Sequence, residues 1–177
     1  MKSIYLLRHA KSSWDDPSVE DIHRSITKRG QRAAKLMCDY FRVQDIRPAL
    51  VMCSPATRTR QTLDLLRPAL RDAPVDVEPR IYEATRQTLL ARLGELPNSA
   101  GSVLLIGHNP GLERLAVHLI DEAAESPAIL RLHEKYPTGA LAALSAPIDD
   151  WADLKAGVCQ LEAFVRPSDL EALAGRV

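Results

Sequence analysis

Short apolar runs alternate with longer amphipathic stretches along this chain. Runs of four or five mostly apolar residues are typical of buried β-strands. Five such runs occupy residues 4–7, 50–53, 103–106, 140–144 and 161–165. The segment 72–79 is expected to leave a helix and then form a short strand at the edge of the sheet.

Between these runs, apolar residues recur at the spacing of an α-helix. Thr27 is placed to cap a helix that runs to about residue 41, and Asn109 and Pro110 stand where an N-cap and a first-turn proline belong. The pattern predicts helices through residues 28–41, 63–70, 85–93 and 112–120, and one that begins at Ser126-Pro127. Strands that alternate with helices indicate an α/β fold with a mostly parallel central sheet covered on both faces, a three-layer α/β/α sandwich.

Composition excludes several classes of protein. A length of 177 residues favours one domain over 1–177. Because 23 Lys and Arg balance 23 Asp and Glu, the chain lacks the basic footprint of a nucleic-acid binder. No apolar run reaches 18 residues, so no membrane partner is expected. Three cysteines without a CxxC motif, and an N-terminal apolar run too short for a signal peptide, indicate a cytoplasmic protein with reduced thiols.

Charged residues follow three of the predicted strands where each strand ends. Arg8 and His9 follow the first strand. Arg58 opens the helix after the second, and His108 follows the third. Because ligands of open α/β sheets bind beyond the carboxyl ends of the strands, these side chains are expected at one edge of the sheet. Two arginines, two imidazoles and the free N–H groups of helix N-termini make an anion site, whose natural occupant is phosphate. No acidic cluster or metal-binding motif accompanies them, so neither a metal nor a cofactor is expected.

Three segments resemble the signature motifs of the histidine phosphatase (phosphoglycerate-mutase-like) superfamily. They are Tyr-Leu-Leu-Arg-His-Ala at 5–10, Ser-Pro-Ala-Thr-Arg-Thr-Arg-Gln-Thr at 54–62 and Gly-His-Asn-Pro at 107–110. The opening at 8–14, the region around Trp151 and the segment 164–167 are similar to the short, SixA-type phosphohistidine phosphatases. Ala10 replaces the usual glycine, and no long insertion covers the pocket. The resemblance implies a phosphoglycerate-mutase-like fold with an open pocket suited to a phosphate carried by a protein.

The resemblance also implies roles for the four residues at the strand ends. His9 would be the nucleophile. The ring nitrogen that does not attack would carry the proton and donate it to a backbone carbonyl, so that the attacking nitrogen stays unprotonated. Arg8, Arg58 and a protonated His108 would bind the equatorial oxygens of the phosphoryl group. Arg60 is interpreted as a solvated charge, and Cys53 as a core residue.

Three further positions have two interpretations each. Glu83 lies where many superfamily members keep their general acid, but a glutamate at the start of a helix is also ordinary, because carboxylates favour that end. Arg24 and Asp21 lie in the loop where the short branch places substrate-facing charges, but both could equally be surface charges before a helix.

Together these observations predict a metal-independent phosphatase with a phosphohistidine intermediate, acting on phosphohistidine in a signalling or phosphotransfer protein. One alternative is a phosphomonoesterase of a small metabolite. A second alternative, from a different class, is a module that binds phosphoproteins without turnover. The expected partner is accordingly a phosphorylated protein or a small phosphate ester.

Overall fold

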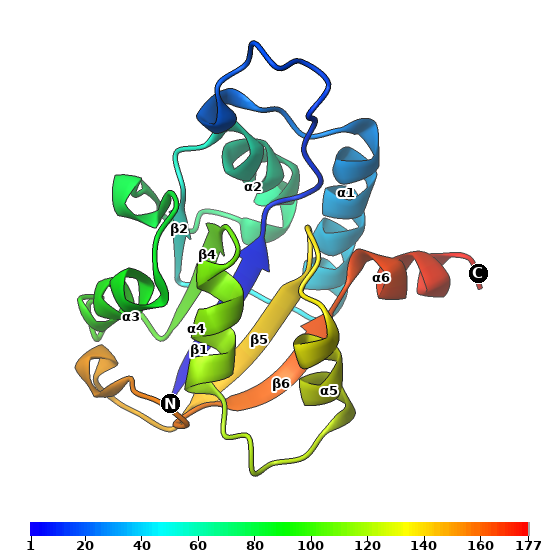
Figure 1. The fold of residues 1–177 in the computed structure, drawn as a ribbon. Coiled ribbons are helices and arrows are strands. Elements are labelled where there is room, and N and C mark those ends of the chain that lie inside the picture. Colours follow the sequence, from blue (N-terminus) through cyan, green and yellow to red (C-terminus); the bar gives the residue numbers. More distant parts are fainter. Residues whose placement is uncertain (177) are drawn as a thin grey trace.

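One mixed β-sheet forms the centre of the molecule (Figure 1). The computed structural model describes residues 1–176. Within them the strands are β1 (Lys2–Arg8), β2 (Leu50–Cys53), β3 (Val75–Val77), β4 (Ser102–Gly107), β5 (Leu141–Ala146) and β6 (Gln160–Val165). They lie side by side in the order β3-β2-β4-β1-β5-β6. The five predicted strands and the predicted edge strand are confirmed.

The sheet is mostly parallel, as predicted. Strands β3, β2, β4 and β1 pair in parallel. Strand β5 runs antiparallel to β1, and β6 runs antiparallel to β5, so β5 alone of these strands is reversed.

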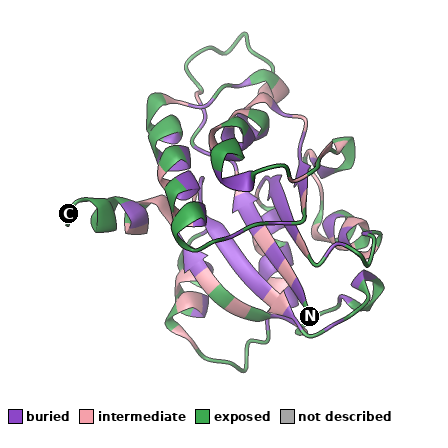
Figure 2. Ribbon diagram, turned by 180° about the vertical axis from the view of Figure 1, so that it is seen from behind, coloured by how far each residue is buried: buried purple, intermediate pink, exposed green. Residues whose placement is uncertain are grey.

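Helices cover both faces of the sheet and complete an α/β/α sandwich (Figure 2). They are α1 (Lys28–Val43), α2 (Thr57–Leu70), α3 (Arg86–Gly94), α4 (Gly111–Leu119), α5 (Pro127–Glu134) and α6 (Pro167–Ala174). Helices α1, α2 and α6 pack in one hydrophobic core, and α3, α4 and α5 pack in the other. Alternation along β1 serves both cores, since Ile4 and Leu6 belong to one and Leu7 to the other. Among residues 1–176, no helix has the length and hydropathy needed to cross a bilayer.

Capping side chains set three of the described helix starts where the sequence predicts them. The Thr27 side chain accepts the N–H of Gly30 at the start of α1, and Thr85 and Ser126 cap α3 and α5 in the same way. The predicted start of α4 is wrong by one residue. Pro110 occupies the N-cap position, while Asn109 Oδ1 reaches past it to accept the N–H of Glu113 at 3.2 Å.

Helix α6 was not among the elements that periodicity predicts. It has a local signal, however. Pro167 stands at its first position, and the Asp169 carboxylate accepts the N–H of Arg166 at 2.9 Å.

Strand register brings the ends of three strands to one edge of the sheet. Arg8 on β1 lies opposite Gly107 on β4, and Cys53 on β2 lies opposite Ile106. The chain leaves β1 toward α1 in one layer and leaves β4 toward α4 in the other, so a crevice opens between these two strands. The segment between β1 and α1, drawn in blue, projects beyond this edge (Figure 1).

Candidate active site

His9 is the first residue beyond β1 and is fixed on three sides. Its backbone N–H donates to the Gly107 carbonyl at 3.1 Å, and its own carbonyl accepts the N–H of Gly139 at 2.9 Å. Gly139 has a φ of 77°, a conformation that glycine adopts without strain. The ring nitrogen Nδ1 lies 2.8 Å from the Ala10 carbonyl, which can only accept, so Nδ1 carries the proton and Nε2 is the free base. The predicted backbone anchor for this ring is confirmed.

The electrostatic surroundings keep the His9 ring neutral. Burial, helped by the nearby His108 and Arg58, lowers its pKa to about 3, although the hydrogen bond to the Ala10 carbonyl acts in the opposite direction. The side chain is therefore an unprotonated imidazole at neutral pH. This is the form that a nucleophile requires.

His108 is the first residue beyond β4, and its ring centroid lies 5.4 Å from that of His9. Its Nε2 lies 2.7 Å from Ser54 Oγ. Because Ser54 Oγ already accepts the N–H of Ala56 at 3.3 Å, its hydroxyl proton is free to be donated to His108 Nε2. When the Ser54 hydroxyl donates to Nε2, the single N–H proton of the neutral His108 ring lies on Nδ1.

The sequence-based expectation of a protonated His108 does not hold for the protein alone. Burial and, second to it, the charge of Arg58 together lower the pKa of His108 to about 4. A neutral His108 with its proton on Nδ1 is still a hydrogen-bond donor. An anionic phosphoryl group beside it would raise the pKa again.

Three buried donor nitrogens belong to the residues expected to bind phosphoryl oxygens. They are Nε of Arg8, Nε of Arg58 and Nδ1 of His108, none of which has a hydrogen-bond partner within residues 1–176. Buried donors without partners are rare in proteins because each costs on the order of 1–3 kcal/mol. Their concentration around His9 indicates a site that receives an anion.

Asp21 links Arg58 and Arg24 through its carboxylate. Its Oδ2 accepts from Arg58 at 3.0 Å and from the Tyr82 hydroxyl at 2.5 Å, and its Oδ1 accepts from Arg24 at 3.1 Å. Burial raises the pKa of Asp21, but the hydrogen bonds from Tyr82 and Arg58 outweigh it and bring the pKa down to about 2. Asp21 is thus a fixed anion that orients cations and not a proton donor at neutral pH.

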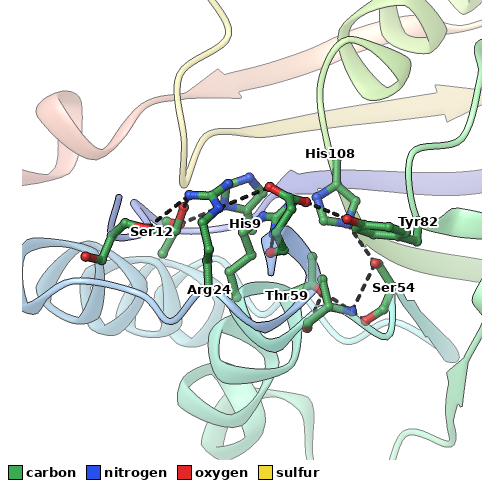
Figure 3. A network of polar contacts seen from close by, with 12 residues as sticks. His9, Ser12, Arg24, Ser54, Thr59, Tyr82 and His108 are labelled. Carbon is green, nitrogen blue, oxygen red and sulfur yellow. Dashed lines mark hydrogen bonds and ion pairs between the residues drawn. The ribbon is translucent and has the colours of Figure 1, made fainter. Parts of the chain in front are cut away.

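Arg24 is a buried part of this network, so its interpretation as a surface charge is wrong. Only 8% of the residue is exposed, and it donates to Ser12 Oγ at 2.6 Å. Its guanidinium lies 3.5 Å from the ring centroid of Trp14, which is 71% exposed. In Figure 3, Arg24 and Ser12 lie on one side of His9, and Tyr82 and His108 lie on the other.

Glu83 lies outside any helix, which removes the interpretation as an ordinary helix-start glutamate. Helix α3 begins three residues later, with Thr85 as its cap. Glu83 has a backbone φ of 53°, a value that residues other than glycine rarely adopt. The next carbonyl, that of Ala84, would stand 2.2 Å from a Cβ added at Gly111, so glycine is needed where this loop crosses α4. The loop is thereby held against the site, with Glu83 exposed on its wall.

All six candidate residues, Arg8, His9, Arg24, Arg58, Glu83 and His108, line one cavity of ≈ 500 Å³, which we call the site cavity. Its walls also include Trp14, Asp21, Arg86 and Arg114. Five arginines face two carboxylates there, so the cavity favours anions.

Sequence reasoning missed Ser54, Tyr82 and Trp14 as parts of the site. Ser54 ends β2 beside His108, and the Tyr82 ring meets the His108 ring edge-on at 5.5 Å. Ser54 stands first in a quoted motif and Trp14 ends another, so both carried a signal. Tyr82 carried none, because its contact with Asp21 spans 61 positions of sequence.

The described residues offer neither a reactive cysteine nucleophile nor a cluster of metal ligands. The Cys53 thiol is fully buried, and burial raises its pKa to about 12, which makes it a poor nucleophile. Within residues 1–176, no three His, Cys, Asp or Glu side chains come together in a way that could hold a metal ion.

The model of the histidine phosphatase superfamily (branch 1) matches residues 4–92. The chain belongs to this superfamily. It is therefore a phosphatase, and its structural relatives place it in the SixA-type branch. The matched residues include Arg8, His9, Arg58 and Glu83.

Relatives match over almost the whole chain. An uncharacterized protein of Mycobacterium tuberculosis is 33% identical over 162 residues, which are 91% of this chain and 99% of that protein. A SixA protein of Nakamurella multipartitia, named as a candidate phosphohistidine phosphatase, has a TM-score of 0.79 at 29% identity, covering 94% of this chain and 96% of that one. A SixA protein of Agrobacterium tumefaciens, named in the same way, has a TM-score of 0.78 at 28% identity, covering 94% and 98%.

Proposed function

We propose that this phosphatase removes the phosphoryl group from phosphohistidine on a protein, through a phosphohistidine intermediate on His9 and without a metal ion. The observation that carries the proposal is the neutral Nε2 of His9 among three buried donors without partners. A free base beside convergent N–H groups is the arrangement needed to attack phosphorus and to stabilise the charge that develops on its oxygens.

The reaction proceeds in two steps. His9 is phosphorylated in the first and dephosphorylated in the second. In the first, Nε2 attacks phosphorus in line, a P–N bond forms to His9, and the bond to the substrate's imidazole breaks. In the second, water attacks phosphorus and gives up a proton, the P–N bond to His9 breaks, and phosphate is released, which leaves His9 as a neutral ring. Arg8, Arg58 and the Nδ1–H of His108 bind the equatorial oxygens in both steps.

Proton transfer distinguishes phosphohistidine from alkyl phosphate esters. The leaving imidazole of phosphohistidine can depart already protonated, so the first step needs little help from an acid. In the proposed second step, Glu83, which is exposed on the cavity wall, accepts a proton from the attacking water. For an alkoxide leaving group, the same carboxyl would have to donate a proton first.

A protein substrate fits the open form of the site. The exposed ring of Trp14 and the exposed side chain of Glu83 lie on the wall of the site cavity, so a phosphorylated side chain on a protein surface can enter from solvent. The names of the SixA relatives support the same substrate. The three free, buried thiols suit the reducing cytoplasm, where we place the enzyme.

A dephosphorylation screen tests the proposal. Purified protein is offered a phosphohistidine phosphotransfer domain, a set of sugar phosphates and a set of nucleotides, each with and without EDTA. We expect the highest kcat/KM for the phosphohistidine domain, no loss with EDTA and inhibition by vanadate. A higher kcat/KM for a sugar phosphate would contradict the substrate. Loss of activity with EDTA that Mg²⁺ restores would contradict the metal-free mechanism.

A further inference from the structure

Two arginines outside the phosphate-binding cluster line both the site cavity and a second hollow beside it. Arg86 is the first residue of α3, and Arg114 is the fourth residue of α4. The second hollow, which we call the α3–α4 groove, has a volume of ≈ 470 Å³. Its walls are Arg86, Pro110, Glu113, Arg114, Val117 and His118. Because the cavity and the groove share Arg86, Pro110 and Arg114, the groove continues the cavity outward.

The positions of these two arginines are electrostatically unfavourable for the folded protein. Cations are disfavoured near helix N-termini, where acidic side chains normally lie, and the first turn of α3 contains no acidic residue. Two like charges beside one hollow also repel each other. Features that break such local rules without compensation inside the protein mark functional positions.

Neighbouring arginines show what compensation looks like in this part of the molecule. Arg80 and Arg92 are both paired with Glu78 and Glu95, at distances from 2.9 to 3.6 Å. Within residues 1–176, neither of the two groove arginines forms an ion pair, and Glu78 and Glu95 pair with Arg80 and Arg92 instead. The guanidinium groups of Arg86 and Arg114 are therefore free to pair with an anionic ligand.

The one acidic side chain of the groove is already engaged. The Glu113 carboxylate accepts a hydrogen bond from Asn109 Nδ2 at 3.3 Å, which ties it to the loop after β4. Arg86, Arg114 and the imidazole of His118 remain to face an incoming group. Because two guanidinium groups outnumber the one carboxylate, the groove presents hydrogen-bond donors and net positive charge to anything that extends beyond the site cavity.

We propose that Arg86 and Arg114 form a second anion subsite, which binds a carboxylate of the substrate protein next to the residue that carries the phosphoryl group. The inference rests on the proposed function. A protein is the source because Arg114 is exposed and the groove leads outward, so the second anion must be presented from outside the site cavity. An Asp or Glu side chain flanking the phosphorylated residue meets this requirement.

Peptide binding measured by calorimetry tests the subsite without turnover. Two peptides carry a stable phosphonate analogue of phosphohistidine and differ only in having Asp or Asn at the flanking positions. The proteins are wild type, Arg86→Gln, Arg114→Gln and the double variant. Arg32→Gln serves as the control, because Arg32 is an exposed arginine on α1 that lines neither hollow.

We expect wild type to bind the Asp peptide about tenfold more tightly than the Asn peptide. Each groove substitution should weaken the Asp peptide roughly threefold, which is the size of an exposed ion pair, and the double variant should lose the preference. Binding of the Asn peptide by the groove variants should fall less than binding of the Asp peptide, and all binding by Arg32→Gln should stay at the wild-type value.

Several results would overturn the subsite. They are equal binding of the two peptides by wild type, no binding of either, or an equal loss in Arg32→Gln and Arg114→Gln, which would indicate only the overall charge. In a third arm of the experiment, binding of a small phosphate ester that carries a carboxylate is measured. If the double variant weakens that ester while the peptides bind equally, the anion comes from a small molecule. Turnover of a true phosphohistidine peptide is measured separately. Its absence, with the charge preference intact, contradicts the proposed function and not the subsite.

Discussion

The hydroxyl oxygen of Ser54 lies 2.7 Å from Nε2 of His108 and holds that ring against the site. We expect this contact to decide which nitrogen of His108 carries the proton. In wild type, the ¹⁵N chemical shifts of His108 should report a neutral ring protonated at Nδ1. In Ser54→Ala the two tautomers should mix, and kcat/KM should fall about tenfold, the effect of one weakened donor. An unchanged tautomer with unchanged activity would show that Ser54 only fills space.

Arg58 and the exposed Arg60 offer a matched pair of charges two residues apart on α2. Arg58→Ala removes a donor aimed at the phosphoryl group and should lower kcat/KM by roughly a hundredfold or more, whereas Arg60→Ala should stay within a few-fold of wild type. Thermal unfolding of both variants controls for damage to the Asp21 network. Equal losses at the two positions would point to a diffuse basic patch rather than a site.

The role of Glu83 depends on the leaving group. If Glu83 is the proton donor, Glu83→Gln should slow hydrolysis of alkyl phosphates strongly, because an alkoxide needs a proton to leave. Hydrolysis of p-nitrophenyl phosphate should change little, since nitrophenolate leaves without one. A steady-state comparison of the two ester classes checks this. If both fall by the same factor, Glu83 binds substrate or supports its loop instead.

Both site histidines should make the folded protein lose stability in mild acid. The folded-state pKa values of about 3 for His9 and about 4 for His108 lie below the value of about 6.5 in an unfolded chain. Below pH 6.5 the unfolded state therefore binds more protons, so the free energy of unfolding falls as the pH drops, by up to about 1.4 kcal/mol per pH unit for each histidine.

Denaturant unfolding between pH 7 and pH 5 measures this slope. The Asp21 carboxyl, with a pKa of about 2, stays ionised across that range and does not contribute. His108→Gln, which cannot titrate at that position, should show a shallower slope than wild type. Parallel slopes for the two proteins would mean that His108 is not held neutral.

The sequence predicts the sheet well because most strands contain a short apolar run that ends at a polar or turn residue, as 103–106 does between Ser102 and Gly107. It also places Arg8, His9 and His108 at one edge, since parallel strands end together. It does not predict that β5 runs in reverse, because apolar runs carry no direction. The helix at Pro167 escapes a search for periodicity, because it is a short C-terminal element in which only Leu170 is buried.

The contacts between loops are the part that sequence could not supply. Asp21 meets Arg58 and Tyr82 only after its own segment, helix α2 and the segment around Tyr82 have folded together, across 37 and 61 positions. Nothing local distinguishes such a carboxylate from a solvated one. The neutral state of His108 escapes sequence reasoning for the same reason, because it depends on how deeply the folded chain buries the ring and how near Arg58 lies.

The central claim is that His9 becomes phosphorylated during turnover, and trapping the labelled enzyme tests it most directly. Wild type and His9→Ala are incubated briefly with a ³²P-labelled substrate, quenched in denaturant at alkaline pH, and mapped by proteolysis and mass spectrometry. The account predicts label on His9 that survives base and is lost in acid, and none in His9→Ala, whose fold is checked by circular dichroism. Label on a serine or cysteine, or turnover retained by His9→Ala, would contradict it.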